Sequence, residues 1–258
     1  MRLTVLGGCG AWPTAGQACS GYLLEHHGFR LVIDPGYATL PRLLEVIGAE
    51  LIDAVLISHG HPDHCADLSP MLRARALRED PPPALAVYTL PGALDPVLAL
   101  DRPGMLAHAY AVREFAAGDH FAVGPFEVDT WLLPHFVPNV GARLTADGQT
   151  LAYTGDTGPS RDLLRLARDA DLFLAEATYA ERVPPAAARY LSSARQAGEN
   201  AARAGVGHLL LTHLWPGSDP HAAEAAARRA YRGTVGVARG GMCIDLDGQP
   251  PGPQTTQS

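Results

Sequence analysis

The feature that most constrains this chain is the segment 59–64, His-Gly-His-Pro-Asp-His, which places four potential metal ligands within six residues. It directly follows the apolar run 53–57, which predicts a strand that ends where the segment begins. Buried imidazoles and carboxylates carry a desolvation penalty unless they have partners. We therefore expect this strand end to face a cleft, where His59 and His61 hold one cation and Asp63 and His64 reach a second.

Three further candidate ligands occupy the same position relative to other predicted strands. His135, Asp156 and His213 each come directly after a short apolar run. Side chains carried on loops at strand ends are typical of functional sites on a rigid scaffold. Neutral imidazole together with carboxylate favours Zn(II), with Mn(II) or Fe(II) as alternatives. The sequence therefore predicts a site for two metal ions, formed by His59, His61, Asp63, His64, His135, Asp156 and His213.

Strand-like runs recur along the whole chain and alternate with helical patterns. Runs rich in leucine or β-branched residues predict strands at 3–6, 21–25, 29–33, 54–58, 86–89, 126–133, 141–145, 150–154, 172–175 and 208–212. Helical periodicity predicts helices at 40–47, 68–77, 160–168, 193–204 and 221–231. Leading strands followed by alternating strands and helices are typical of a layered α/β domain. We expect one domain over residues 1–248 and a disordered tail, rich in Pro, Gly, Gln and Thr, at 249–258.

The composition limits the possible partners. Of the 258 residues, 47% are hydrophobic and 18% are charged, which suits one domain with a full core. The formal net charge of −7 argues against long nucleic acid, because phosphate contacts require a basic surface. No apolar run approaches the roughly 20 residues of a membrane span, and no secretory signal pattern opens the chain. We expect a cytoplasmic protein that acts on a small anionic molecule, with a homodimer as an open alternative to a monomer.

The remaining cysteines and histidines show no second pattern. The four cysteines are scattered and form no C-x-x-C pair, which argues against a disulfide framework and against a sulfur-ligated zinc site. The six histidines outside the predicted site are expected at the surface or at helix ends. Two of them are adjacent, His26 and His27, and their side chains should diverge because successive strand residues point to opposite faces.

Taken together, the motifs resemble those of the metallo-β-lactamase superfamily, in particular the branch that contains RNase Z and the related cyclic-nucleotide phosphodiesterases. The segment 59–64 and the later His, Asp and His occur in the family's order. The Gly-rich stretch 6–14 is similar to that branch's first loop, 32–36 matches the family's early Asp, and 176–179 resembles its Glu-Ala-Thr-aromatic motif. The resemblance covers almost the whole chain. It implies a four-layer αβ/βα sandwich, with two β-sheets face to face, helices outside and metals at one sheet edge.

The resemblance also implies a role for individual residues. His59, His61 and His135 would bind the first metal, Asp63, His64 and His213 would bind the second, and Asp156 would bridge both. Asp34 would orient a ligand imidazole by hydrogen bonding; the alternative is a polar turn residue before Pro35. Asp63 would also orient the attacking nucleophile.

Two departures from that branch bear on the substrate. His135 and Asp156 are only 21 positions apart, so no room remains for the protruding arm with which RNase Z enzymes hold tRNA. The histidine that assists at the scissile phosphate in related enzymes is absent, and its place falls on Leu191, next to Tyr190. Glu176 therefore lacks its expected partner and is either catalytic or a structural hydrogen-bonding residue. Tyr190 is either a substitute acid or a packing aromatic.

The predicted chemistry follows from the metal site. Two metal ions lower the pKa of a shared water, so that hydroxide is available near neutral pH to attack phosphorus or a carbonyl carbon. The leading prediction is hydrolysis of a small phosphodiester, such as a cyclic nucleotide or a short oligonucleotide. Acyl hydrolysis, as in lactonases and thioesterases of the same superfamily, is the alternative. A metal-binding protein without catalytic activity is the third possibility.

Overall fold

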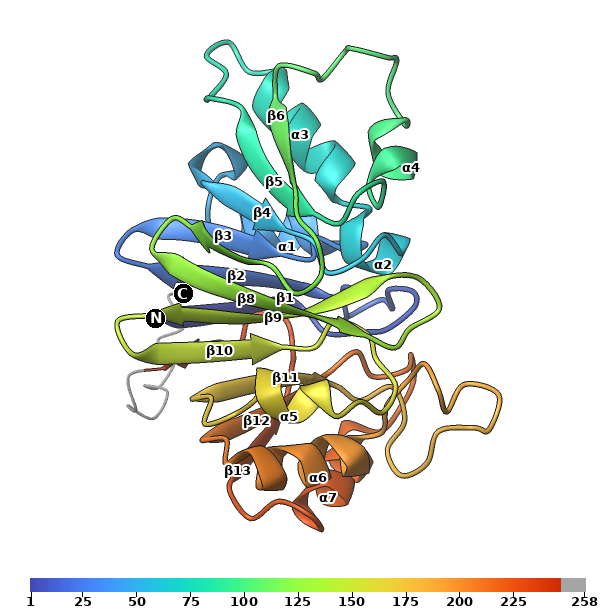
Figure 1. The fold of residues 1–258 in the computed structure, drawn as a ribbon. Coiled ribbons are helices and arrows are strands. Elements are labelled where there is room, and N and C mark those ends of the chain that lie inside the picture. The colour runs from blue at the N-terminus through green and yellow to red at the C-terminus, as the bar shows by residue number, and fades with distance from the viewer. Residues whose placement is uncertain (247–258) are drawn as a thin grey trace, which may run out of the picture.

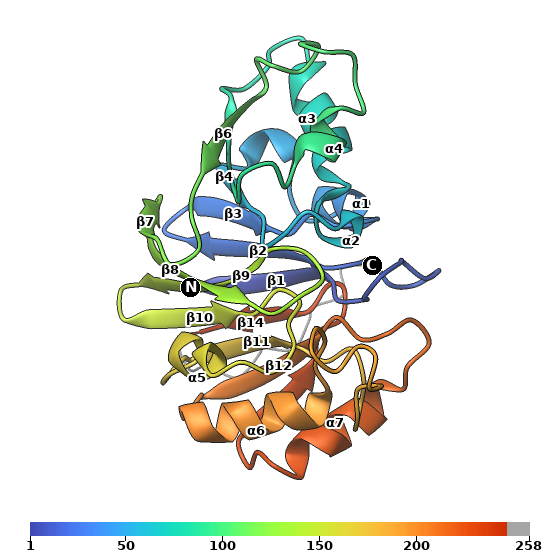
Figure 2. The same ribbon diagram turned by 45° about the vertical axis from the view of Figure 1, so that its right-hand side comes forward.

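The computed structural model describes residues 1–246 of the chain. The tail predicted at 249–258 and the end of the predicted domain at 247–248 lie outside the described residues. In the described part, two β-sheets pack face to face and helices cover the outer face of each, as Figures 1 and 2 show. The predicted four-layer αβ/βα fold class is therefore confirmed.

The first sheet combines antiparallel and parallel pairing. Its strands are, in spatial order, β14 (Cys243–Asp245), β1 (Arg2–Gly7), β2 (Gly21–His26), β3 (Phe29–Ile33), β4 (Ala54–Leu56), β5 (Leu85–Thr89) and β6 (Tyr110–Glu114). Neighbouring strands from β14 to β3 are antiparallel, and those from β3 to β6 are parallel. Its outer face is covered by α1 (Thr39–Leu44), α3 (Leu68–Ala76) and α4 (Asp95–Leu98), with η1 (Ala49–Leu51) and α2 (Pro62–Cys65) in the connecting segments.

The second sheet has the same plan. Its strands are, in spatial order, β13 (Thr234–Val237), β12 (His208–Thr212), β11 (Leu172–Glu176), β10 (Gln149–Tyr153), β9 (Asn139–Ala146), β8 (Phe126–Leu133) and β7 (His120–Val123). Its outer face is covered by α5 (Asp162–Leu166), α6 (Ala194–Ala204) and α7 (Pro220–Arg228). None of the helices found in residues 1–246 is long and apolar enough to cross a membrane.

Three apolar cores hold the four layers together. Because successive side chains of a strand point to opposite faces, Leu24 of β2 packs between the sheets while Leu23 packs under the helices of the first sheet. In β12, Leu210 packs between the sheets while Leu209 and Leu211 pack against α5, α6 and α7. Strands buried on both faces read as continuous apolar runs, which is why the sequence predicts them.

All the predicted strands and helices are present, with ends that differ by three residues at most. The pattern does not predict β6, β7, β13 and β14, and these are the outermost strands of the two sheets. An edge strand pairs on one side only and often carries charged side chains. In β6, for example, Val112, Arg113 and Glu114 are all exposed. Edge strands therefore lack the apolar signal of the central ones.

The carboxyl ends of the central strands meet at one end of the sandwich. β3, β4 and β5 run parallel to one another, as do β10, β11 and β12. The loops that follow β3, β4, β8, β10 and β12 carry the residues predicted to form the site. Ligands of open α/β sheets bind outside the carboxyl ends of the strands, so the fold brings the predicted residues to the position where binding is expected.

Candidate metal centre

The seven predicted metal-binding side chains lie together at this end of the sandwich, and we call this cluster the metal centre. They reach it on the loops after β4, β8, β10 and β12. The cluster divides into two groups of potential ligand atoms that lie within 4.8 Å of one another: His59, His61, His135 and Asp156 form the first, and Asp63, His64, Asp156 and His213 form the second. Asp156 belongs to both groups.

Three imidazoles converge in the first group. His59 Nε2 and His135 Nε2 each lie 3.1 Å from His61 Nδ1. Asp156 Oδ2 is 3.9 Å from His59 Nε2 and 3.7 Å from His135 Nε2. Spacings of this size suit nitrogens that surround one cation at about 2.0–2.1 Å each.

The second group is richer in carboxylate. His213 Nε2 lies 3.2 Å from Asp63 Oδ2 and 3.1 Å from Asp156 Oδ2. His64 Nε2 lies 3.2 Å from the other Asp156 oxygen, Oδ1. The Asp156 carboxylate thus lies between the ligand atoms of the two groups.

Hydrogen bonds on the far side of the rings fix the tautomers of His64 and His135. His64 Nδ1 donates to Asp34 Oδ2 at 2.8 Å, and His135 Nδ1 donates to the Tyr190 carbonyl oxygen at 3.0 Å. An ionised carboxylate and a carbonyl can only accept, so each neutral ring carries its proton on Nδ1. The Nε2 lone pairs of both rings therefore face the metal centre.

Hydroxyl groups fix the rings of His59 and His213 in the same way. Ser58 Oγ donates to the Asp34 carboxylate at 2.5 Å and can therefore accept from His59 Nδ1 at 3.0 Å. Thr178 Oγ1 donates to a Glu176 oxygen at 2.6 Å and can accept from His213 Nδ1 at 3.0 Å. Supporting hydrogen bonds of this kind accompany nearly all metal-binding histidines.

Two buried polar atoms indicate whether these residues could hold a metal ion. His64 Nε2 and Asp156 Oδ1 are buried and have no hydrogen-bond partner among the described residues. When His64 Nε2 carries no proton, its lone pair faces the Asp156 oxygen 3.2 Å away with no donor between them, which is costly. A cation between them would satisfy both, so the residues present fit a divalent metal ion.

The pKa values of the ligands respond to burial and to one another. Burial lowers the pKa of His59, His61 and His135, which keeps these rings neutral. Burial also opposes protonation of His64 and His213, but nearby carboxylates, Asp156 above all, raise the pKa of both. Without a cation, the buried carboxylates attract protons to the second group. A metal ion would replace those protons.

The pKa of Asp156 is lowered well below its usual range. Burial works in the opposite direction, but the neighbouring His213 and His64 outweigh it. The pKa of Asp63 is lowered for the same reason, with His64 as the main favourable neighbour. Both carboxylates are therefore ionised and available as ligands at neutral pH.

The backbone at the metal centre adopts unusual conformations. Asp34 and His213 have positive φ angles of 48° and 57°, a region that costs non-glycine residues free energy. Gly10 lies so close to His213 that an added Cβ would stand 2.8 Å from the imidazole. Positive-φ residues held by their surroundings are often found at functional sites.

Asp34 lies where the sequence predicts a supporting residue. Its carboxylate accepts from the Ser58 backbone N–H at 2.7 Å, the Tyr153 hydroxyl at 2.7 Å, and the Ser58 and His64 side chains. Ser58, Tyr153 and Thr178 were not among the predicted site residues. Thr178 lies within the 176–179 motif, but nothing local in the sequence indicates that Tyr153 reaches across from the opposite sheet.

Glu176 is fully buried and forms hydrogen bonds on both carboxylate oxygens. It accepts from the Thr157 and Ser192 backbone N–H groups as well as from Thr178. Burial raises the pKa of Glu176 to about 8, with the charge of Asp156 as a further cause. Thr178 links Glu176 to the His213 ring, because the threonine hydroxyl contacts both.

Tyr190 and Leu191 lie in different surroundings. Leu191 is buried, and Tyr190 is partly exposed. The Tyr190 ring packs against Phe136, with ring centroids 4.6 Å apart, and the Arg189 guanidinium lies 5.7 Å from its centroid. Its backbone carbonyl holds His135. The role of the Tyr190 hydroxyl as an acid stays a prediction.

A second histidine–aspartate group, the turn group, lies at the opposite end of the strands. His26 Nε2 and His27 Nε2 lie 3.0 Å and 2.6 Å from Asp147 Oδ2. The expectation that the adjacent histidine side chains diverge is wrong. His27 begins the turn after β2 with φ 48°, which returns its ring to the side of His26, with centroids 4.2 Å apart.

Comparisons with known proteins agree with this geometry. Residues 29–214 match the family model described as a beta-lactamase superfamily domain. The probable metallo-hydrolase YhfI of Bacillus subtilis (strain 168) is 30% identical over 249 residues, which cover 94% of this chain and 98% of that protein. The crystal structure of YhfI has a TM-score of 0.85 at 28% identity and covers 94% of this chain and 98% of its own.

Two ribonucleases are also similar. The ribonuclease Z of Kineococcus radiotolerans is 31% identical over 308 residues, covering 98% of this chain and 96% of that protein. The crystal structure of the short form of human tRNase Z has a TM-score of 0.74 at 22% identity, covering 95% of this chain and 99% of that one, and so shares the fold.

Proposed function

Because this chain belongs to the metallo-β-lactamase superfamily and is a metal-dependent hydrolase of that family, we propose that it cleaves small phosphodiesters with two divalent metal ions. The observation that carries the proposal is the position of Asp156, whose carboxylate lies 3.7 Å from His135 Nε2 in the first group and 3.1 Å from His213 Nε2 in the second. A single-metal site would not need a carboxylate shared in this way. We propose Zn(II), with Mn(II) or Fe(II) as alternatives.

Each group of the metal centre would hold one ion. His59, His61 and His135 would hold the first, Asp63, His64 and His213 would hold the second, and Asp156 would contact both. The bound ions would supply an activated water and stabilise negative charge on the substrate oxygens. The protein's part is to hold the imidazoles in place, which the hydrogen bonds of Asp34, Ser58 and Thr178 do.

Asp63 is the residue we propose to orient the attacking water. The Ala11 backbone N–H donates to Asp63 Oδ2 at 2.8 Å, and His213 Nε2 lies 3.2 Å from the same oxygen. These contacts fix the carboxylate plane while its lowered pKa keeps it ionised. A fixed, ionised carboxylate can accept a proton from water or hold it in line with the substrate.

The hairpin between β9 and β10 supports a small substrate. The two strands are joined by Asp147 and Gly148 alone, so no arm extends from this part of the sandwich. The net charge of −7 likewise gives no general attraction for long nucleic acid. We therefore propose a small anionic substrate, a cyclic nucleotide or a short oligonucleotide, in place of tRNA.

Acyl hydrolysis remains the second candidate because of one specific observation. The position expected to carry the assisting histidine of phosphodiesterases is Leu191, a buried apolar residue. A lactone or thioester would not need that histidine. A metal-binding role without catalysis is the third possibility.

The test is a substrate panel with metal-loaded protein. We expect hydrolysis of bis(p-nitrophenyl) phosphate and cyclic AMP, and little or no hydrolysis of a simple lactone. The His59→Ala variant should lose metal and turnover together. Lactone hydrolysis without phosphodiester hydrolysis would replace the proposal with the acyl alternative, and two bound metals without any turnover would support the third.

A further inference from the structure

The exposed aromatic side chains of this protein lie on the loops that carry the residues of the metal centre. Among the described residues, four large aromatic side chains are more than a third exposed: Trp12 at 48%, Tyr37 at 39%, Phe136 at 56% and Trp215 at 39%. The other exposed large hydrophobic side chains are aliphatic. Exposed aromatic rings concentrated at one place mark a site of interaction more often than scattered ones do.

Each of these aromatics is tied to the metal centre through the chain. Trp12 follows Ala11, whose N–H donates to Asp63. Trp215 lies two residues after His213. Phe136 directly follows His135, and Tyr37 lies on the loop that starts at Asp34. The Trp215 backbone N–H also donates to the Thr178 carbonyl oxygen at 3.2 Å. The loops that carry the ligands therefore also carry these rings.

Two of these rings, Trp12 and Trp215, contact each other, and Trp215 also packs beside the partly buried Tyr179; we call these three rings the aromatic platform. The Trp12 and Trp215 rings meet edge to face, with centroids 5.1 Å apart and an interplanar angle of 83°. The Tyr179 ring is nearly parallel to Trp215, at 12° and 6.3 Å. Mutual contacts of this kind hold the rings in place, so the platform keeps flat apolar faces rigid beside the second group of ligands.

Flat, rigid aromatic faces next to a phosphodiester-cleaving centre suit one kind of substituent. Nucleobases stack on aromatic side chains with little dependence on their identity. An aliphatic acyl chain is not planar, so it cannot stack on a flat aromatic ring in this way. We propose that the aromatic platform binds the nucleobase of a nucleotide substrate while its phosphate reaches the metal centre. This inference rests on the proposed phosphodiesterase function.

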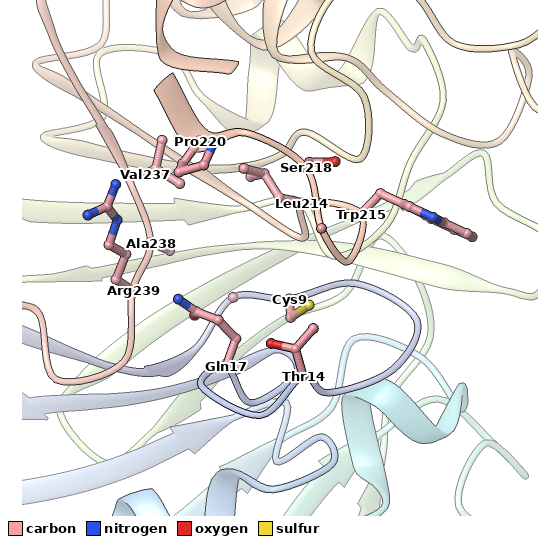
Figure 3. Close-up of a pocket in the computed structure, with 12 residues that line it drawn as sticks. Cys9, Thr14, Gln17, Leu214, Trp215, Ser218, Pro220, Val237, Ala238 and Arg239 are labelled. Carbon is pink, nitrogen blue, oxygen red and sulfur yellow. The ribbon is translucent and has the colours of Figure 1, made fainter. Parts of the chain in front are cut away.

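The cavity that Trp215 helps to line is too small to be the substrate site. It measures about 100 Å³ and lies between the first loop, with Cys9, Thr14 and Gln17, and the loop after His213. Ligand pockets are typically about 300–1,000 Å³. Figure 3 shows the Trp215 side chain pointing away from the other residues that line this cavity.

A larger cavity lies away from the metal centre. It measures about 980 Å³ and is lined by β13, β14 and the start of β12, at the open edges of the two sheets. None of the seven ligands lines it. A nucleotide bound there would not bring its phosphate to the metal centre, so this cavity does not compete with the platform as the substrate site.

A pair of matched substrates tests the inference on metal-loaded enzyme. Thymidine p-nitrophenyl phosphate and methyl p-nitrophenyl phosphate release the same leaving group and differ in the nucleoside. We expect Trp215→Ala and Trp12→Ala to lower kcat/KM for the thymidine diester by about 5- to 100-fold and to leave the methyl diester within about twofold. Trp215→Phe should retain most of the difference in kcat/KM between the thymidine diester and the methyl diester. Leu100→Ala, which removes an exposed apolar side chain elsewhere, should change neither substrate.

Binding gives a readout that does not depend on turnover. Two of the three tryptophans lie in the platform, so AMP should quench the fluorescence saturably while ribose phosphate should not, and Trp215→Ala should weaken AMP binding. Equal losses on both diesters, or no loss on either, would overturn the inference. Hydrolysis of neither diester, with base-dependent quenching intact, would reject the phosphodiesterase function and leave the platform as a nucleotide-binding surface.

Discussion

The metal centre and the turn group contain the same types of side chain at opposite ends of the same strands. β3 separates them, a length of roughly 17 Å at about 3.3 Å per residue. In the metal centre, His59, His64 and Asp156 are buried. In the turn group, the side chains of His27 and Asp147 are 72% and 67% exposed.

The difference lies in what surrounds each group. At the metal centre, hydrogen bonds to Asp34, Ser58 and Thr178 fix the rings, and buried polar atoms lack partners. In the turn group, the side chains of His27 and Asp147 are open to solvent while that of His26 is largely buried, and the interaction with His27 is the main cause of the lowered pKa of Asp147. Histidine and aspartate in proximity are thus not enough for a catalytic centre. Burial with a supporting shell distinguishes the two groups.

The largest expected effect comes from removing the shared carboxylate. Asp156→Ala deletes an oxygen from both groups and leaves the neighbouring imidazoles without their main charge partner. We expect fewer than two metals per chain and a fall in kcat of about 1,000-fold or more. Elemental analysis and steady-state kinetics measure both. Asp147→Ala in the turn group is the matched control and should leave both unchanged; a fully active, fully metallated Asp156→Ala would refute the assignment.

A smaller effect is expected from changing a residue that holds a ligand imidazole by a hydrogen bond. Asp34→Asn keeps the shape of the side chain but removes the charge that holds His64 Nδ1 and the Ser58 hydroxyl. Losing such a partner typically weakens metal binding by about 10- to 100-fold. Competition with a chelator measures the affinity. Asp53→Asn, on an exposed aspartate that accepts from the Arg30 N–H, should show wild-type affinity, and an equal loss there would make the effect non-specific.

The pH dependence should separate metal-free from metal-loaded protein. The pKa values of His64 and His213 are raised in the folded state, so their contribution to stability is complete below about pH 6.5 and is lost as the pH rises through the raised values. Glu176, with a pKa raised to about 8, acts in the same direction between its unfolded value and that pH. Metal binding needs deprotonated ligands, so it strengthens as the pH rises.

The expected result is a gap in Tm between zinc-loaded and metal-free protein that widens from about pH 6 to about pH 8. Each kcal/mol gained should raise Tm by about 2–4 °C in a protein of this size. Differential scanning calorimetry measures the gap. A gap that stays constant over this range would mean that binding releases no protons, contrary to the assignment of His64 and His213 as ligands.

The smallest effect is expected in the turn group. His27→Ala removes a largely exposed ring whose contact with Asp147 is open to solvent, and exposed pairs contribute little. We expect metal content to be unchanged and kcat/KM to stay within about twofold of wild type. A larger loss of activity would show that the turn group acts on the metal centre through the length of β3.

The comparison also shows which features of the protein could be predicted from its sequence. The ligands of the metal centre follow predicted strands whose both faces are buried, so their positions can be read from the apolar runs before them. The edge strands β6 and β13 escape prediction, since one-sided pairing leaves no such run. The contact between His26 and His27 could not be predicted either, because residue types alone do not indicate the positive φ of His27 in the turn.

The sequence by itself determined the central strands, the helices that cover them and the identity of the seven candidate ligands, because burial on both faces and metal chemistry impose local patterns. The four-layer class followed from the resemblance to a known family. Only the tertiary structure decided which atoms face one another. The bond from Tyr153 to Asp34 and the edge-to-face contact of Trp12 with Trp215 join residues more than a hundred positions apart. Such contacts depend on how the two sheets and their loops pack, which no short stretch of sequence specifies.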